Sequence, residues 1–98
     1  MPTYIALNKL TAKGSDAIKD TVKRADQFAQ LAKKLNIELK TVYWGVSPYD
    51  SIAIIEAPNE SNLMAFNLAC KQAGFFTTET VRVFNRSEMS DVIAQLNQ

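Results

Sequence analysis

The sequence contains no histidine and a single cysteine, Cys70. Histidine is the commonest general acid–base group and the commonest metal ligand in proteins. Its absence excludes histidine-dependent catalytic triads, Cys2His2 zinc sites and facial-triad iron sites. A lone thiol cannot form an internal disulfide, which favours the reducing cytoplasm as the location of the protein. We therefore expect a cytoplasmic protein with no metal and no other cofactor.

An excess of either charge is also missing, because 11 basic residues balance 10 acidic ones for a formal net charge of +1. This balance gives no long-range field that would attract a polyanion, so nucleic acid is not an expected partner. No apolar run approaches the ~20 residues that span a bilayer, and the opening MPTYIALNKL lacks the pattern of a signal peptide. We expect no membrane partner. The chain is expected to form a single domain over residues 1–98.

What the sequence does contain is a clear succession of apolar patterns. Alternating or β-branched segments predict strands at residues 3–8, 38–46, 51–57 and 77–84. Apolar stripes with steps of three and four predict helices at residues 16–35 and 59–73, and a short final helix after Asn85. The connection at residues 47–50 is short, so the second and third strands are expected to form an antiparallel hairpin.

Local turn chemistry sharpens the predicted helix ends. Ser15 and Asn59 are the expected N-caps of the two main helices, and Asn36 and Gly74 are their expected stops. Asn85 is expected to form a capping box with Glu88 at the start of the last helix. Lys and Arg side chains of the first helix, including Arg24, are expected on its solvated side. The order β-α-β-β-α-β plus a C-terminal helix predicts an α+β fold, namely a ferredoxin-like sandwich with a four-stranded antiparallel sheet.

One face of this sheet is expected to pack on the two main helices, and the other to be free of helices. The helix-facing set is expected to be Ile5, Leu7, Val81 and Val83. The helix-free face would then display Tyr4, Ala6, Asn8, Thr80, Arg82 and Phe84. Such a face is too apolar to remain in water, so we expect a second copy of the chain to cover it, with room for a cavity between the two sheets. The alternative is that the C-terminal helix of the same chain folds across this face.

Several stretches resemble the GYD-domain family of small bacterial proteins, which is named for a Gly-Tyr-Asp signature. These stretches are MPTYIALNKLTAKG, IKDTVKRADQF, VYWGVSPYDSIAIIEAPNE and TTETVRVF. Tyr49 and Asp50 match the signature, whose glycine falls on Ser47 or Pro48 here. The resemblance implies a ferredoxin-like fold similar to the dimeric α+β barrels, and it implies no particular activity.

A ligand site is expected on the helix-free side. Tyr43 and Trp44 must point to opposite faces of their strand, and the sequence leaves open which of them reaches that side. Arg82 would favour an anionic ligand if it faces a cavity, although a plain ion pair is the simpler use of this side chain. The predicted ligand-binding residues are Tyr4, Asn8, Trp44, Tyr49 and Arg82, and the ligand would be a small apolar or anionic molecule.

The residues at the hairpin allow more than one function. Asp50 is expected to accept backbone N–H bonds and to fix the turn, whereas a raised pKa would let it act as a base. Cys70 is expected to be a small core residue. We favour a non-catalytic, oligomeric module that binds small ligands or other proteins. The alternatives are a cofactor-independent mono-oxygenase or isomerase, with Tyr49 or Asp50 in proton transfer, and a purely structural subunit.

Overall fold

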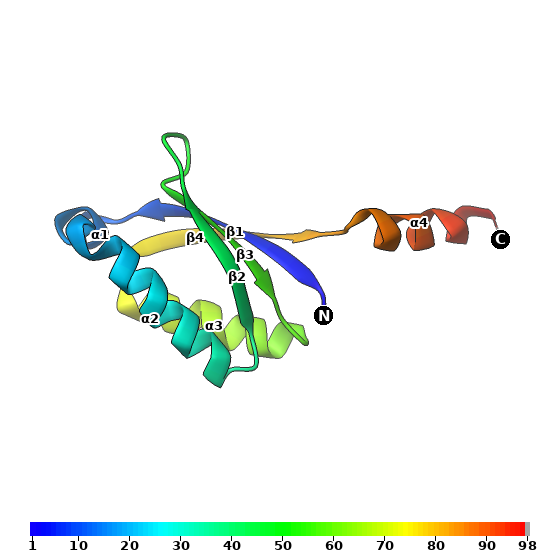
Figure 1. Ribbon diagram of the computed structural model, residues 1–98, viewed down its shortest axis with the longest axis horizontal. Coiled ribbons are helices and arrows are strands. Elements are labelled where there is room, and N and C mark those ends of the chain that lie inside the picture. Colours follow the sequence, from blue (N-terminus) through cyan, green and yellow to red (C-terminus); the bar gives the residue numbers. More distant parts are fainter. Residues whose placement is uncertain (98) are drawn as a thin grey trace.

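Four strands form one antiparallel sheet in the order β2-β3-β1-β4 (Figure 1). This computed structural model describes residues 1–97. The strands are β1 (Thr3–Leu10), β2 (Glu38–Trp44), β3 (Ser51–Glu56) and β4 (Phe76–Val83). The helices are α1 (Ala12–Asp16), α2 (Thr21–Lys34), α3 (Glu60–Ala73) and α4 (Arg86–Ala94), with 3-10 turns at Ile18–Asp20 and Gln95–Asn97.

The predicted ferredoxin-like fold is confirmed. Helices α2 and α3 lie together on one side of the sheet, and no helix within residues 1–97 covers its other side (Figure 1). Strands β2 and β3 pair antiparallel, as expected for a hairpin, and the connection between them contains a cis Ser47–Pro48 peptide bond. No helix within residues 1–97 combines the length and the apolar character that crossing a bilayer requires.

The helix ends follow their local chemistry, with one exception. The Asn59 side chain caps α3 by accepting from the Asn62 N–H, and Gly74 ends that helix in the left-handed conformation at φ 76°. Asn36 takes φ 58° just after α2, and Asn85 and Glu88 form the predicted capping box of α4. The predicted helix ends are confirmed where they depend on a short-range capping hydrogen bond or on a residue in the left-handed conformation.

The exception is the entry to the first helical segment, where the prediction of Ser15 as N-cap was wrong. The chain forms a separate helix α1 whose cap is Thr11, which accepts from the Gly14 N–H. Gly14 lies inside this helix, and a Cβ placed there would come within 2.0 Å of the Phe75 carbonyl oxygen. The glycine therefore allows a close backbone approach between α1 and the start of β4 rather than ending a pattern.

The assignment of the two sheet faces was also wrong, because they are exchanged. Tyr4, Ala6 and Asn8 are buried beneath the helices, and the register places Arg82, Thr80 and Thr78 beside them. The opposite, helix-free face carries Ile5, Leu7, Val81 and Val83 instead. Strand alternation defines two faces without saying which one the helices cover. In this chain both faces are apolar enough to be buried under the helices. Phe84 follows β4 and is 51% exposed.

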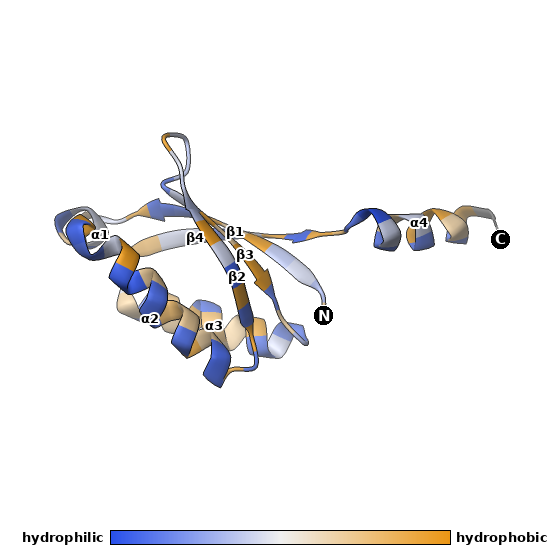
Figure 2. Cartoon of the chain, viewed as in Figure 1, coloured by the Kyte–Doolittle hydropathy of each residue, from blue (hydrophilic) through white to orange (hydrophobic). Residues whose placement is uncertain are grey.

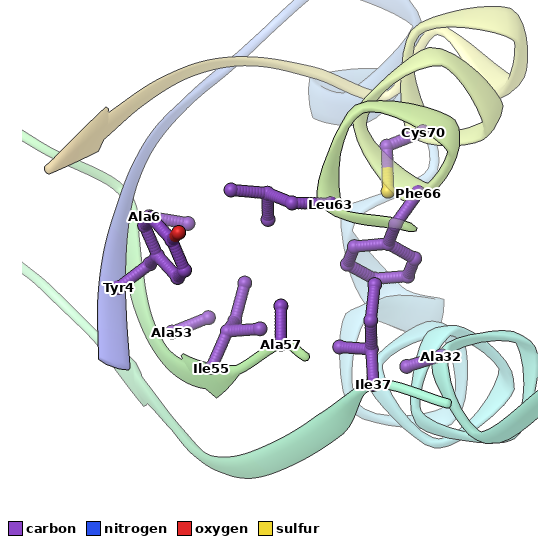
Figure 3. Close-up of a cluster of buried hydrophobic side chains, with 10 residues drawn as sticks. All are labelled: Tyr4, Ala6, Ala32, Ile37, Ala53, Ile55, Ala57, Leu63, Phe66 and Cys70. Carbon is purple, nitrogen blue, oxygen red and sulfur yellow. The ribbon is translucent and has the colours of Figure 1, made fainter. Parts of the chain in front are cut away.

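The core fills the space between the sheet and the helices. Figure 3 shows Ala6 and Ala53 on the sheet, with Phe66 and Cys70 of α3 opposite them. Ile55 is only 2% exposed and lies on the sheet side of this buried cluster, with Ala53 on the same strand. The remaining members of the buried cluster are Tyr4, Ala32, Ile37, Ala57 and Leu63.

Helix α4 does not cover the helix-free face, so the alternative in which it folds across its own sheet is wrong. It projects beyond the end of β4, away from α2 and α3 (Figure 1), and its substantial contacts are with the 3-10 turn that follows it. The radius of gyration is 15.0 Å, whereas a compact chain of this length has about 12.6 Å. The helix-free face is therefore open in the single chain.

Candidate functional site

The helix-free face carries a continuous apolar surface, here called the open strip. Ile5 lies between Ile54 and Val81 across the central strands, and Leu7 pairs with Ile52. Tyr43 of β2 extends the surface beside Ile52 and is 60% exposed. Figure 2 shows the apolar residues along β3 and on α4. The open strip consists of Ile5, Leu7, Ile52, Ile54, Val81 and Val83.

A polar group bounds the open strip at the hairpin end. The Tyr49 hydroxyl donates to Glu79 Oε2 at 3.1 Å, and the Lys9 Nζ lies 5.4 Å from the centre of the Tyr49 ring. The hydrogen bond to the Glu79 carboxylate, helped by its negative charge, raises the pKa of the Tyr49 phenol. A phenol held protonated in this way is a poor proton acceptor near neutral pH.

On the other side of the sheet, a cavity of about 90 Å³ lies between α2, α3 and the strands. We call it the helix-side cavity. Asn8 and Trp44 line it, and Ser51 stands between them in the register of the sheet. Its charged lining residues are Arg24 and Asp50, and its apolar lining includes Ala6, Phe28, Val42, Ala53, Ile55 and Phe66.

The walls of this cavity are fixed by hydrogen bonds across the layers. The Trp44 Nε1 donates to Thr21 Oγ1 at 3.0 Å and so ties the edge strand β2 to α2. Asn8 is 5% exposed, and its amide accepts from Thr78 at 2.8 Å and donates to Ser51 at 3.1 Å. Trp44 thus faces the helices, and Tyr43 faces the helix-free side, which answers the question left open by the sequence.

The five predicted ligand-binding residues do not meet at one place. Asn8 and Trp44 line the helix-side cavity, whereas Tyr49 lies at the end of the open strip. Tyr4 is buried, and Arg82 stacks on the Phe84 ring at 4.2 Å. Arg82 also forms an ion pair with Glu88 of α4 at 3.5 Å, which is the simpler of the two uses considered for it.

Asp50 joins the hairpin to the central strand. Its Oδ2 accepts from the Leu10 backbone N–H at 2.7 Å, and its own N–H donates to the Asn8 carbonyl at 2.8 Å. The Asp50 carboxylate therefore has a structural partner on β1 and lies on the cavity side. Tyr49 points to the opposite side of the sheet, so the two residues do not form a joint acid–base site.

Cys70 is buried in α3, and burial raises the pKa of its thiol to about 11. The thiolate is the nucleophilic form, so this cysteine is inert near neutral pH. Within residues 1–97, no cluster of acidic, cysteine or histidine side chains has the geometry to hold a metal ion.

Sequence reasoning missed Arg24 as a lining residue. Its position among the lysines of α2 suggested a solvated side chain, but it is 7% exposed and stacks over the Phe75 ring at 3.9 Å from the ring centre. The contact depends on the fold of α1 and β4, so no helical periodicity could reveal it.

Comparison with known proteins adds a family and a relative. The model of the GYD domain matches residues 4–93. The chain is 26% identical over 97 residues to a protein of Thermus thermophilus, covering 98% of this chain and 99% of that protein. That relative is named "Glutamine synthetase and cystathionine beta-lyase binding protein". A search of solved structures gave no match.

Proposed function

Because the chain belongs to the GYD-domain family, and a relative of the same length is named for binding enzymes, we propose that it is a non-catalytic interaction module that works as a homodimer. The open strip is the observation that carries this proposal. It combines aliphatic side chains from three neighbouring strands with the absence of any covering helix in the described chain. Exposed apolar surfaces of this kind mark protein interaction sites.

The proposed partner for the open strip is a second copy of the chain. In an isologous dimer the two open strips face each other, in the manner of a dimeric α+β barrel. Helix α4 supports this choice, since its apolar side is also exposed and it already extends beyond its own sandwich. Met89 and Ile93 of α4 are 46% and 47% exposed, and Leu96 of the following 3-10 turn is 77% exposed. In the proposed dimer, a neighbouring copy would give the exposed apolar side of α4 a surface to pack on, which its own chain does not provide.

The second part of the proposal concerns the partner protein. The Thermus relative is named for binding glutamine synthetase and cystathionine beta-lyase. The helical layer remains outward in the proposed dimer and offers Met64 and Leu68 on α3, which are 57% and 49% exposed. We propose this outer side of α3 as the contact for another protein.

Native mass spectrometry and size-exclusion chromatography with light scattering test the dimer. The wild-type chain is expected to be dimeric. Val81→Glu places a charge in the open strip, on the edge strand β4 beside Ile5. An unpaired carboxylate buried in the interface is costly, so this variant is expected to raise the dissociation constant at least about tenfold. Met64→Glu, a matched change on α3, is expected to leave the dimer intact. A monomeric wild-type chain, or a Val81→Glu variant that dimerises normally, would contradict the proposal.

Calorimetric titration tests the second contact. The probes are purified glutamine synthetase and cystathionine β-lyase from the same organism as the chain. Met64→Glu is expected to weaken binding while the dimer persists. Failure of both enzymes to bind the wild-type dimer would exclude them as partners.

A further inference from the structure

We propose that the free edge of β4 binds an extended segment of another protein as an additional strand of the sheet, and that Glu79 selects a segment with a basic residue at the opposing position. Strand β4 is the last strand on its side of the sheet, next to β1. An edge strand presents unpaired backbone N–H and C=O groups, with which an extended peptide can pair. The edge differs from the open strip and from the outer side of α3, so this inference goes beyond the proposed function.

Strand β4 forms a regular ladder along its whole length. Its register with β1 runs without interruption from Leu10 opposite Phe76 to Thr3 opposite Val83. The eight residues of β4 extend over roughly 26 Å at ~3.3 Å per residue. In an antiparallel ladder, alternate residues bond to the neighbouring strand, and the residues between them direct their N–H and C=O groups outward. The outer edge of β4 is therefore a long and continuous row of such groups.

The middle of this edge has no backbone partner within residues 1–97. Two carbonyl groups at its ends are used, because the Phe75 carbonyl accepts from the Thr11 N–H and the Val83 carbonyl accepts from the Arg82 side chain. Apart from the ladder with β1, no hydrogen bond of the described chain involves the backbone of residues 76–82. These outward groups are available to a strand from outside.

The two edges of the sheet differ in how they are protected. Natural edge strands avoid unwanted pairing by means of bulges, lysine and proline. Strand β2 has a bulge between Leu39 and Thr41, and the Lys40 side chain at this bulge forms ion pairs with Glu38 and Glu56. The sequence of β4, FTTETVRV, contains neither lysine nor proline, and its threonines and valines favour a strand. The edge of β4 is thus the one suited to pairing.

Glu79 gives this edge a charge preference. It lies on the helix-free face of β4, opposite Leu7, and is exposed. Its carboxylate accepts from the Tyr49 hydroxyl at 3.1 Å but has no ion-pair partner among residues 1–97. The other charge of β4, Arg82, already pairs with Glu88. Because opposite charges at directly opposing positions stabilise neighbouring strands, a lysine or arginine opposite Glu79 is favoured.

A second copy of the chain does not supply this cation. Antiparallel strands of one sheet place residues of the same face opposite each other. The helix-free face of a second β4 offers no cation to Glu79, because Arg82 lies on the helix side, opposite the buried Tyr4. Lys40 of a second β2 lies at the bulge and is already paired. The occupant that fits is a segment of a different protein, with a basic residue between apolar residues that extend the sheet beside Val81.

An NMR titration of the full, ¹⁵N-labelled chain tests this pairing. The probe is the peptide acetyl-Thr-Val-Thr-Lys-Thr-Val-Thr-amide, which presents valine and lysine on one side and threonine on the other. We expect saturable shifts at the backbone amides of β4. A peptide with glutamate in place of lysine is expected to bind about fivefold more weakly. No saturable shift at β4 with the lysine peptide, or equal binding of the glutamate peptide, would overturn the proposal.

Two N-methylated isomers of the lysine peptide test whether its backbone pairs. Alternate N–H groups of a strand point the same way, so methylating one alternate set blocks the pairing edge and methylating the other set leaves that edge free. One isomer is expected to bind at least about tenfold more weakly than the parent, and the other to bind like it. Isomers of equal affinity would refute strand addition.

Hydrogen exchange of the peptide-free chain tests the competing occupant. Every second amide of β4 is expected to exchange rapidly, and to slow when the lysine peptide binds. Slow exchange of all β4 amides without peptide would show that a second copy already occupies the edge, and would overturn the proposal.

Charge reversal locates the selecting residue. Glu79→Lys is expected to reverse the preference, so that the glutamate peptide binds more tightly than the lysine peptide. Glu38→Lys is the matched change on the opposite edge strand β2 and is expected to retain the wild-type preference. Both positions are exposed, and circular dichroism checks that both variants fold. A Glu79→Lys variant that still prefers the lysine peptide would contradict the assigned role of Glu79.

Discussion

Removing the Asp50 carboxylate should destabilise the fold, because this group connects the β2–β3 hairpin to the end of β1. The Asp50→Ala change leaves the Leu10 N–H without its acceptor at 2.7 Å. Hydrogen bonds to charged groups contribute ~1.5–3 kcal/mol to stability. Asp50 is half-buried, so we expect the lower end, about 1.5 kcal/mol. In a domain of this size that loss lowers Tm by roughly 6–12 °C.

Chemical denaturation followed by circular dichroism measures this loss at a fixed protein concentration, because dimerisation would couple stability to concentration. Asp50→Asn retains a side-chain oxygen and is expected to lose less, about 0.5 kcal/mol. Asp26→Ala removes an exposed acid from α2 and serves as the control. A free energy of unfolding for Asp50→Ala within ~0.5 kcal/mol of the wild type, as for an ordinary surface change, would refute the structural role of this carboxylate.

Two further predictions rest on perturbed pKa values. Burial raises the pKa of the Cys70 thiol to about 11. At neutral pH this thiol should therefore react with a disulfide reagent only as fast as the protein opens. Rapid reaction of the native chain would contradict the burial of Cys70. The hydrogen bond from the Asn85 backbone lowers the pKa of Glu88, so its contribution to α4 is present above the ordinary glutamate pKa of about 4.3 and is lost as pH falls through the lower folded value. The first turn of α4 should therefore fray at low pH, which amide NMR signals of this helix would report. Glu88→Gln should abolish the pH dependence of the fraying.

Much of the fold could be predicted because its signals are local. The Asn59 cap, the Gly74 stop and the Asn85–Glu88 box each depend on residues within one helical turn. The four-stranded antiparallel sheet followed from the alternation of elements and from the short hairpin connection. These features need no knowledge of what lies across the molecule.

The features that failed depend on distant parts of the chain. Ile5 and Tyr4 both suit a buried position, and only the packing of α2 and α3 decides that Tyr4 is the one beneath them. Arg24 is buried because Phe75, far along the chain, supplies a ring to stack on. The candidate site was affected in the same way, since Asn8 and Trp44 were identified as lining residues but were placed on the wrong side of the sheet.

The separation of the layers has a consequence for how this molecule would meet a larger protein. Helices α2 and α3 occupy one side of the sheet and the open strip the other (Figure 1). In the proposed dimer, paired through the strip, both helical layers would face outward and the assembly would be divalent. An oligomeric enzyme with repeated sites at a matching distance would then be held by two weak contacts at once, and the avidity of the pair would exceed the affinity of either contact.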